Sequence, residues 1–260
     1  MVKKDFVKNL FSIEGKVAIV TGATGSLGSA VAEGYALQGA KVVLTGRNEK
    51  KLKEVNEKVK GEGCDCAYFV AETVNEEEVK NLVNFTVETY GELNILCACH
   101  GFNKPMTVLD QSLEDWQFLM DANLKSIYLL SKYTAEQMVK QGKGGKLVLT
   151  SSARSKRGMK GYTGYCTSKA GVDLMAQSLA CDLGEHNIQV NTFNPTVFRS
   201  PLTEWMWDDD KVYQNFLKRL PIGRLGEPED FIGIATFLAS PASDFLTASN
   251  YAADGGYWGN

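Results

Sequence analysis

The fold is decided near the N-terminus by the stretch Lys16-Val17-Ala18-Ile19-Val20-Thr21-Gly22-Ala23-Thr24-Gly25-Ser26-Leu27-Gly28. The run after Lys16 is apolar and partly β-branched, which is typical of a buried strand. A helical pattern begins after the glycines, with apolar residues at 31, 35 and 36. Glycines between a strand and a helix let the backbone approach a pyrophosphate, whose charge the helix N-terminus favours. Such a loop is weak evidence alone, but its position after the first strand strengthens the interpretation.

Strand patterns and helix patterns then alternate along the whole chain. Further strands are expected at residues 41–45, 66–70, 93–97, 146–150, 189–193 and 250–256. Helical patterns cover residues 49–60, 75–90, 113–138 and 228–239, with another starting at Tyr165. This alternation predicts an α/β fold with one doubly wound, seven-stranded parallel sheet and helices on both faces. No linker, repeat or low-complexity segment interrupts it, so we expect residues 1–260 to form a single domain.

Composition limits the classes of function. The chain has 260 residues and a net charge of -3, which argues against a nucleic-acid or anionic-membrane binder. No apolar run reaches the ~18 residues that a membrane span needs. Residues 1–14 contain lysines but no long apolar stretch, so we interpret them as a lead-in rather than a signal peptide. We therefore expect a cytoplasmic enzyme or binding protein whose partner is a small molecule.

Cysteine and histidine are the residues that raise the question of a metal site. There are six cysteines and two histidines, and two short clusters, 64–66 and 97–100, have the look of ligand pairs. No CxxC recurs, however, and Cys97 and Cys99 fall on one face of an expected strand. A structural zinc site remains an alternative, but we expect buried reduced thiols and no metal. Reduced thiols also favour the cytosol.

The chemistry is expected between residues 151 and 169. Ser152 follows an apolar strand, and Tyr165 and Lys169 lie one helical turn apart on the same face. An ammonium beside a phenol favours the phenolate, so we expect the pKa of Tyr165 to fall toward neutrality. Such a tyrosine exchanges a proton with an alcohol or carbonyl oxygen, and the Ser152 hydroxyl would hold the same oxygen. This is an acid/base site that requires a redox partner.

Arg47 indicates which redox partner to expect. It follows the second strand, where an NAD site usually has an acidic residue for the ribose 2′-hydroxyl, whereas arginine suits a 2′-phosphate. No acid stands at positions 45–47. The sequence therefore favours NADP(H) over NAD(H), although a solvent-exposed loop arginine is the alternative interpretation.

A cluster of cations borders the expected site. Arg154, Lys156, Arg157 and Lys160 lie between Ser152 and Tyr165, without an intervening acid, and Lys104 is a further candidate. They would attract a carboxylate or phosphate. Two alternatives stay open: a solubilising loop, or salt bridges to the acids at 208–210. Those acids belong to residues 200–220, which we expect to form a flap over the cleft. Its aromatic residues would stack on a substrate: Trp205, Trp207 and Tyr213.

The motifs together resemble the short-chain dehydrogenase/reductase family over essentially the whole chain. They are the loop at 21–28, Asn123, Ser152, the Tyr165-xxx-Lys169 pair, Asn194-Pro195 and Asp254-Gly255-Gly256. The chain is most similar to gluconate 5-dehydrogenases and 3-oxoacyl-carrier-protein reductases. The resemblance implies a Rossmann fold, hydride transfer to or from a nicotinamide, and a homotetramer. It also implies that Tyr165 is the acid/base, that Lys169 lowers its pKa, that Ser152 holds the substrate oxygen and that Asn123 supports a water relay.

The residue patterns above and the resemblance together give the residues expected around cofactor and substrate. Cofactor contacts are expected at Gly22, Thr24, Gly25, Ser26, Leu27, Gly28, Arg47, Glu72, Cys99, Gly101, Tyr165, Lys169, Pro195 and Val197. Substrate contacts are expected at Ser152, Arg154, Arg157, Tyr162 and Trp205.

Three departures from the family pattern concern the cofactor region. Gly25 comes one position early, and Ser26 stands where this subgroup usually has a glycine. The family's Asn-Asn-Ala-Gly is Ala98-Cys99-His100-Gly101 here, so an amide is lost and a titratable ring is gained near the cofactor. Thr196 replaces the glycine after Pro195.

The expected function is NADP(H)-dependent interconversion of a secondary alcohol and a ketone, on a small anionic substrate such as a sugar acid or keto acid. Reduction of a neutral sugar, a steroid or a 3-oxoacyl substrate is the main alternative. A sugar-nucleotide epimerase is favoured only by the spacing of Gly25, and little chain remains after Asp254 for the added substrate domain of such enzymes. A dinucleotide-binding module without turnover is the non-enzymatic alternative, and the intact catalytic motif speaks against it.

Overall fold

A single parallel sheet of seven strands forms the centre of the protein. The computed structural model describes residues 2–201, 203–206 and 208–259. The strand order is β3-β2-β1-β4-β5-β6-β7, and every neighbouring pair is parallel. The strands are β1 (Val17–Thr21), β2 (Lys41–Gly46), β3 (Cys66–Val70), β4 (Ile95–Ala98), β5 (Gly145–Thr150), β6 (Ile188–Pro195) and β7 (Asn250–Ala253). The expected doubly wound α/β architecture is confirmed.

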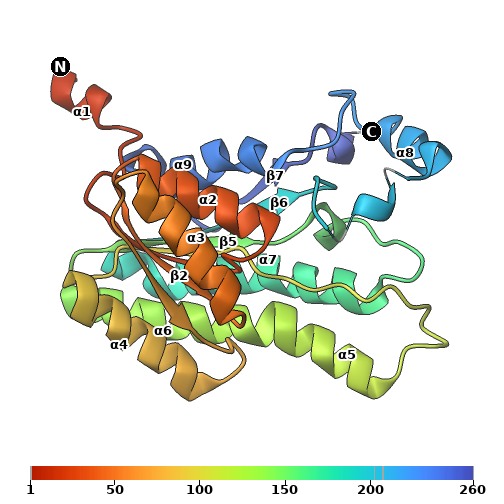
Figure 1. Cartoon of the computed structure of the whole chain (residues 1–260), viewed down its shortest axis with the longest axis horizontal. Coiled ribbons are helices and arrows are strands. Elements are labelled where there is room, and N and C mark those ends of the chain that lie inside the picture. The colour runs from red at the N-terminus through yellow and green to blue at the C-terminus, as the bar shows by residue number, and fades with distance from the viewer. Residues whose placement is uncertain (1, 202, 207, 260) are drawn as a thin grey trace.

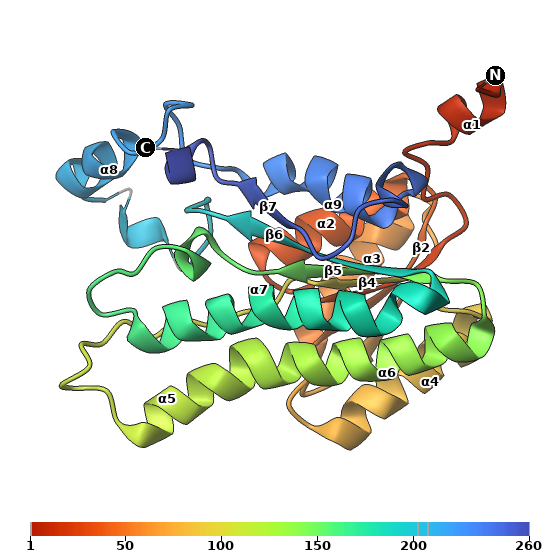
Figure 2. The same cartoon turned by 180° about the vertical axis from the view of Figure 1, so that it is seen from behind.

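Helices cover both faces of the sheet (Figures 1 and 2). One face carries α2 (Ser26–Leu37), α3 (Glu49–Gly61) and α9 (Ile232–Ala239). The other carries α4 (Glu76–Tyr90), α6 (Ser126–Gln141) and α7 (Thr163–Leu183). Each layer buries its own apolar cluster against the sheet, which is why the central strands β1 and β4 are buried along their whole length.

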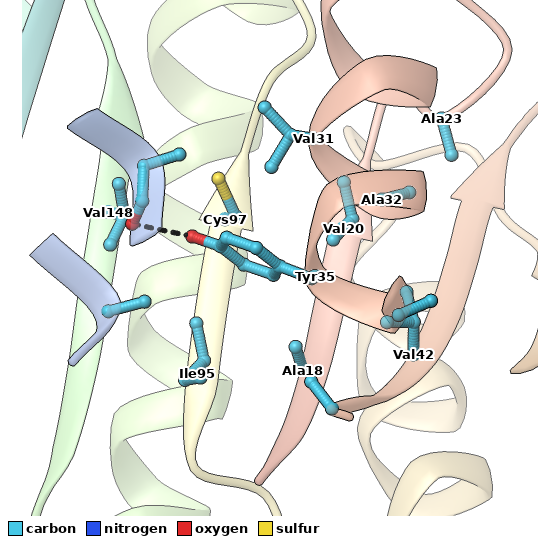
Figure 3. Close-up of a cluster of buried hydrophobic side chains, with 14 of the residues drawn as sticks. Ala18, Val20, Ala23, Val31, Ala32, Tyr35, Val42, Ile95, Cys97 and Val148 are labelled. Atoms are coloured by element: carbon cyan, nitrogen blue, oxygen red, sulfur yellow. Dashed lines mark hydrogen bonds between the residues drawn. The ribbon is translucent and has the colours of Figure 1, made fainter. Parts of the chain in front are cut away.

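Tyr35 connects α2 to α9 on the same face of the sheet (Figure 3). Its ring is fully buried between α2 and the sheet, near Ile95 and Cys97. Its hydroxyl donates to the carbonyl oxygen of Ala235 in α9 at 2.8 Å. A buried phenol needs such a partner, so this bond lets a large aromatic ring fill the core without leaving a polar atom unsatisfied.

The long helical pattern at 113–138 is interrupted in the structure. Helix α5 (Leu113–Met120) runs through a π-helical turn, Asp121–Lys125, into α6. Asn123 lies inside this turn and is fully buried. A buried amide inside a helix needs hydrogen-bond partners outside that helix.

Several element boundaries differ from the expected ones. Strand β4 begins at Ile95 rather than 93, and the side chain of Asn94 just before it accepts the amide of Val17 at 2.8 Å. Helix α7 begins at Thr163, before Tyr165. The last helical pattern starts as a 3₁₀ turn, Pro228–Phe231, before α9. Strand β7 stops at Ala253, and Gly255 and Gly256 then turn the chain with positive φ.

The remaining helices lie at the ends of the molecule. Helix α1 (Lys4–Lys8) projects from the sheet at the opposite end from α8 (Asp210–Leu217), which lies near the C-terminus (Figure 1). Across the described residues no helix has the length and apolar character to cross a membrane. Every cysteine is a free thiol, and Cys181 is exposed rather than buried. Within 2–201, 203–206 and 208–259, three or more potential metal ligands gather nowhere.

Candidate active site

The parallel strands all end at the same edge of the sheet, and the loop after β1 has the features of an anion-binding turn at that edge. Gly22 has φ +64°, and a Cβ there would lie 2.9 Å from the Cα of His100. A Cβ on Gly28 would lie 2.2 Å from the carbonyl oxygen of Gly22. Only glycine fits at either position. Helix α2 begins at Ser26 without a side-chain cap, so its first amide groups remain available to a phosphate.

Gly25, which comes one position earlier than in the family pattern, fits the loop without backbone strain. Gly25 is the N-cap of α2 with φ -94°, a conformation open to any residue. Its amide donates to the Gly22 carbonyl at 2.9 Å, and Ser26 opens the helix. Because the N-cap residue Gly25 has no side chain, the N-terminus of α2 has no side-chain cap.

Arg47 and Glu72 mark the adjacent strand ends. Arg47 follows β2 and Glu72 lies beyond β3, and their charged groups are 3.7 Å apart (Nη1 to Oε2). Their side chains are 69% and 42% exposed. The pair is therefore accessible to a ligand.

Ser152, Tyr165 and Lys169 converge where β5 ends and α7 begins. Ser152 is 6% exposed and Lys169 is 2% exposed. The Lys169 ammonium donates to the carbonyl oxygen of Thr150 at 3.0 Å. Burial lowers the pKa of Lys169 to about 8, and the charges of Asp173 and Cys99 oppose that change. The ammonium is thus held beneath the site and is close to titration at physiological pH.

The expectation for Tyr165 was wrong in direction. Burial raises the pKa of its phenol above the ordinary value, while a hydrogen bond from Ser152 and the charge of Arg154 oppose the rise. Lys169 is not among the groups that shift this pKa, and its ammonium donates to the Thr150 carbonyl instead of the phenol. The phenol is therefore protonated at neutral pH and is ready to act as an acid.

Asn123 connects the π turn to the rest of the site. Its Oδ1 accepts the amide of Phe102 at 2.7 Å, and its Nδ2 donates to the Phe102 carbonyl at 2.8 Å and to Ser168 Oγ at 3.0 Å. Gly101 precedes this contact, and a Cβ there would lie 3.1 Å from Lys169 Nζ. The structure thus brings all four expected catalytic residues to one place.

A buried carboxylate, Asp173, was missed by the sequence reasoning. It lies one turn after Lys169 on α7 and is 6% exposed. The Asn194 amide donates to both of its oxygens at 3.1 and 3.0 Å, and the Thr192 hydroxyl donates at 3.0 Å. Asn194 also donates to the Ser152 carbonyl at 3.3 Å. The spacing of Asp173 from Lys169 was the signal that could have identified it.

His100 bridges the end of β1 and the start of α6. Its Nδ1 lies 2.6 Å from Thr21 Oγ1 and its Nε2 lies 2.7 Å from Ser126 Oγ. Burial lowers the pKa of His100 to about 3, and the charges of Lys169 and Arg47 act in the same direction. The expected titratable ring is therefore neutral under ordinary conditions. Beside it, Cys99 Sγ lies 3.5 Å from Cys97 Sγ.

The basic loop contacts the C-terminal aromatic residues. Arg154 donates to the hydroxyl of Tyr257 at 2.8 Å, and Arg157 donates to the carbonyl of Trp258 at 2.9 Å. The Lys156 ammonium lies 4.1 Å from the centroid of the Trp258 ring. Neither a purely solvated loop nor a simple cleft lining describes these cations. Lys104 lies outside this cluster and is paired with Asp115 at 2.6 Å.

The other expected contact residues fall around the same edge. The Tyr162 ring meets the Tyr165 ring edge-on, with centroids 6.1 Å apart. Pro195 ends β6, and Val197 packs in an apolar cluster with Ala153. Thr24, Leu27 and the other loop residues lie between β1 and α2. The side chain of Trp205 and all of Trp207 lie outside the described residues.

Comparison with known proteins gives a consistent result. The family model described as enoyl-(acyl carrier protein) reductase matches residues 22–258. An uncharacterized oxidoreductase of Mycobacterium tuberculosis is 39% identical over 253 residues, covering 95% of this chain and 93% of that protein. The gluconate 5-dehydrogenase of Gluconobacter oxydans is 32% identical over 248 residues, covering 95% and 96%.

A solved structure extends this comparison to the fold. The gluconate 5-dehydrogenase of Burkholderia cenocepacia, in complex with NADP and tartrate, superposes with a TM-score of 0.93. It is 27% identical and covers 98% of this chain and 99% of that one. With a matching family model over nearly the whole length, this chain belongs to the short-chain dehydrogenase/reductase family and is an oxidoreductase.

Proposed function

We propose that this single-domain enzyme uses NADP(H) to interconvert a secondary alcohol and a ketone on a small anionic substrate, such as a sugar acid or keto acid. The observation that carries the proposal is the convergence of Ser152, Tyr165 and Lys169, with Arg154 directly beside Ser152. The gluconate dehydrogenases among its relatives support the substrate class.

The residues at the sheet edge fit a dinucleotide. The glycine loop excludes side chains where a backbone must approach a phosphate, and the uncapped N-terminus of α2 favours its charge. Arg47 would hold a 2′-phosphate, and Pro195 and Val197 would border the nicotinamide end. When bound, the nicotinamide supplies or accepts the hydride. NADP is bound in the structure of the B. cenocepacia relative, which supports this choice over NAD.

Tyr165 and Ser152 would handle the proton. For reduction, the protonated phenol donates its proton to the carbonyl oxygen as the carbon receives the hydride, and an alcohol results. For oxidation, the phenolate takes the alcohol proton, so the oxidation rate should increase as pH rises toward the raised pKa of Tyr165. Ser152 would donate to the same oxygen, and Lys169 with Asn123 would return the proton through solvent.

Arg154 would provide the selectivity for an anion. Its amide donates to Ser152 Oγ at 3.1 Å, so its backbone is fixed relative to the catalytic hydroxyl. A guanidinium next to that hydroxyl would bind a carboxylate while the neighbouring carbinol carbon faces Tyr165. Tartrate, a dicarboxylate, is present with NADP in the B. cenocepacia structure.

Further parts of the proposal concern the flap, the assembly and the compartment. We place a flap at residues 200–220, where α8 packs Tyr213, Phe216 and Leu217 into the apolar cluster around Ala153. We also propose a homotetramer in the cytosol. Exposed apolar residues on α5, α6 and α7 support assembly: Phe118, Tyr128 and Leu174. The free thiols are compatible with a reducing compartment.

A substrate panel tests the proposal. Purified protein with NADP⁺ is offered D-gluconate and neutral polyols, and with NADPH it is offered keto acids, neutral ketoses, steroids and 3-oxoacyl thioesters. We expect the acids to give the highest kcat/KM, and Arg154→Met to raise KM for acids alone. Equal turnover of acids and neutral ketones, unaffected by Arg154→Met, would transfer the assignment to a neutral or 3-oxoacyl substrate.

A further inference from the structure

The C-terminal turn, residues 254–259, lies against the catalytic loop and buries an aromatic ring beneath two cations. Tyr257 is 4% exposed and packs in the same apolar cluster as Ala153, the residue after Ser152. The guanidinium carbons of Arg154 and Arg157 lie 5.2 and 5.3 Å from the centroid of its ring. One aromatic ring therefore supports two of the cations of the basic loop.

Tyr257 also fixes the direction of one of these cations. Its hydroxyl accepts a hydrogen bond from Arg154 Nη1 at 2.8 Å. At the other end of the same residue, the Arg154 amide is bonded to Ser152 Oγ at 3.1 Å. Arg154 is thus held at both ends, by the catalytic serine and by the C-terminal turn.

The turn that carries Tyr257 is itself rigidly built. Asp254 is 6% exposed, and its carboxylate accepts the amides of Gly256 at 2.9 Å and Trp258 at 2.8 Å. The Trp258 indole then donates to the carbonyl of Ala153 at 2.8 Å. Hydrogen bonds from Trp258 to Ala153, from Arg154 to Tyr257 and from Arg157 to Trp258 join the C-terminal turn to the loop that holds the catalytic serine.

From this arrangement we infer that Tyr257 is a specificity-determining residue: it orients Arg154 so that the enzyme binds a substrate carboxylate. The inference rests on the proposed function, since it requires an anionic substrate at Arg154. A long, flexible arginine loses rotamer freedom when it binds, and a preoriented guanidinium loses less. Removing the Tyr257 hydroxyl should therefore weaken acid binding without affecting the proton chemistry at Tyr165.

The test compares Tyr257→Phe, Arg154→Met and the double variant with the wild-type enzyme. Tyr257→Phe keeps the ring in the core and removes only the acceptor of the Arg154 hydrogen bond. Tyr90→Phe is the matched control, because its hydroxyl donates to Asp65 at 2.9 Å at the distant edge of the sheet. The readouts are the Kd of tartrate for the NADP⁺-loaded protein by calorimetry, and KM and kcat for D-gluconate and its neutral counterpart D-glucitol.

We expect Tyr257→Phe to raise the tartrate Kd and the gluconate KM about tenfold, the effect of one hydrogen bond to a charged group. The kcat values and the glucitol KM should stay within about twofold of wild type, as should every constant of Tyr90→Phe. In the Arg154→Met background, Tyr257→Phe should have no further effect.

The contrary results separate the two claims. If Arg154→Met weakens acid binding but Tyr257→Phe does not, the role of Tyr257 is refuted and the proposed function stands. An equal rise in KM for gluconate and for glucitol in Tyr257→Phe would show that Tyr257 has only a structural role, and would refute its role in specificity. If wild type and Arg154→Met bind the acids equally, or wild type binds neither acid, the anionic substrate is refuted together with the inference.

Discussion

Replacing Glu72 by glutamine should strengthen the preference of the enzyme for NADPH. Glu72 Oε2 lies 3.7 Å from Arg47 Nη1, so the carboxylate competes for the guanidinium that would hold a 2′-phosphate. It would also repel that phosphate directly. The same carboxylate favours the binding of NADH, since it can accept a hydrogen bond from the ribose 2′-hydroxyl. Glu72→Gln removes the charge and nearly preserves the shape.

The exposure of the pair sets the size of the effect. Because the two side chains are 69% and 42% exposed, water screens their charges strongly. Two unit charges about 4 Å apart interact by about 1 kcal/mol in water. A phosphate carries between one and two charges near neutral pH, so removing the repulsion should change the preference by about five- to tenfold. Arg47→Met should lower the same preference at least tenfold.

The assay measures kcat/KM with NADPH and with NADH on one ketone at two salt concentrations. We expect the NADPH/NADH ratio to rise in Glu72→Gln and to fall in Arg47→Met, with the NADPH constants more sensitive to salt. Glu136→Gln is the control, because it breaks an exposed pair with Lys132 on α6, away from the sheet edge. A ratio that is unchanged or lower in Glu72→Gln would refute the reasoning.

Three other predictions concern the buried lysine, the histidine and the assembly. Burial lowers the Lys169 pKa from 10.5 to about 8, so between these pH values the unfolded chain binds more protons than the folded one and stability rises with pH. In urea unfolding, the free energy of unfolding of wild type should increase by about 3 kcal/mol relative to Lys169→Met as pH rises through this window. A difference that stays constant with pH would contradict the prediction. His100→Ala removes the contacts to Thr21 and Ser126 and should weaken NADPH binding about tenfold, measured by fluorescence titration, with partial recovery in His100→Gln. Unchanged NADPH binding in His100→Ala would refute a role of His100 in supporting the cofactor site. Leu174 is 65% exposed on α7, so Leu174→Lys should dissociate the proposed homotetramer in sedimentation experiments, and a monomeric wild type would disprove the proposal.

Much of the fold could be predicted because local patterns and long-range packing agree here. The apolar runs 17–21 and 95–98 become the fully buried strands β1 and β4. Gly22 could be interpreted from its position alone, since a turn between a strand and a helix requires positive φ there. The hydrogen bonds of Asn123 also agree with its residue type, because a buried amide in a helix needs partners outside that helix.

The features that could not be predicted depend on contacts between distant segments. Arg154 and Tyr257 are 103 residues apart, and nothing in either neighbourhood indicates that they meet. The pKa of Tyr165 depends first on the burial of its phenol, and the four-residue spacing from Lys169 does not determine that burial. The bridge made by His100 likewise joins three elements, so a motif that covers one strand end cannot reveal it.

The central claim is that Tyr165 transfers the proton, and Tyr165→Phe tests it most directly. Phenylalanine keeps the ring against Tyr162 and removes only the hydroxyl that Ser152 hydrogen-bonds. Steady-state kcat for NADPH-dependent reduction of the best ketone should fall by about 10²–10⁴-fold, the usual contribution of general acid catalysis, while the Kd of NADPH stays at the wild-type value. A Tyr165→Phe enzyme that retains near-normal kcat would contradict the account.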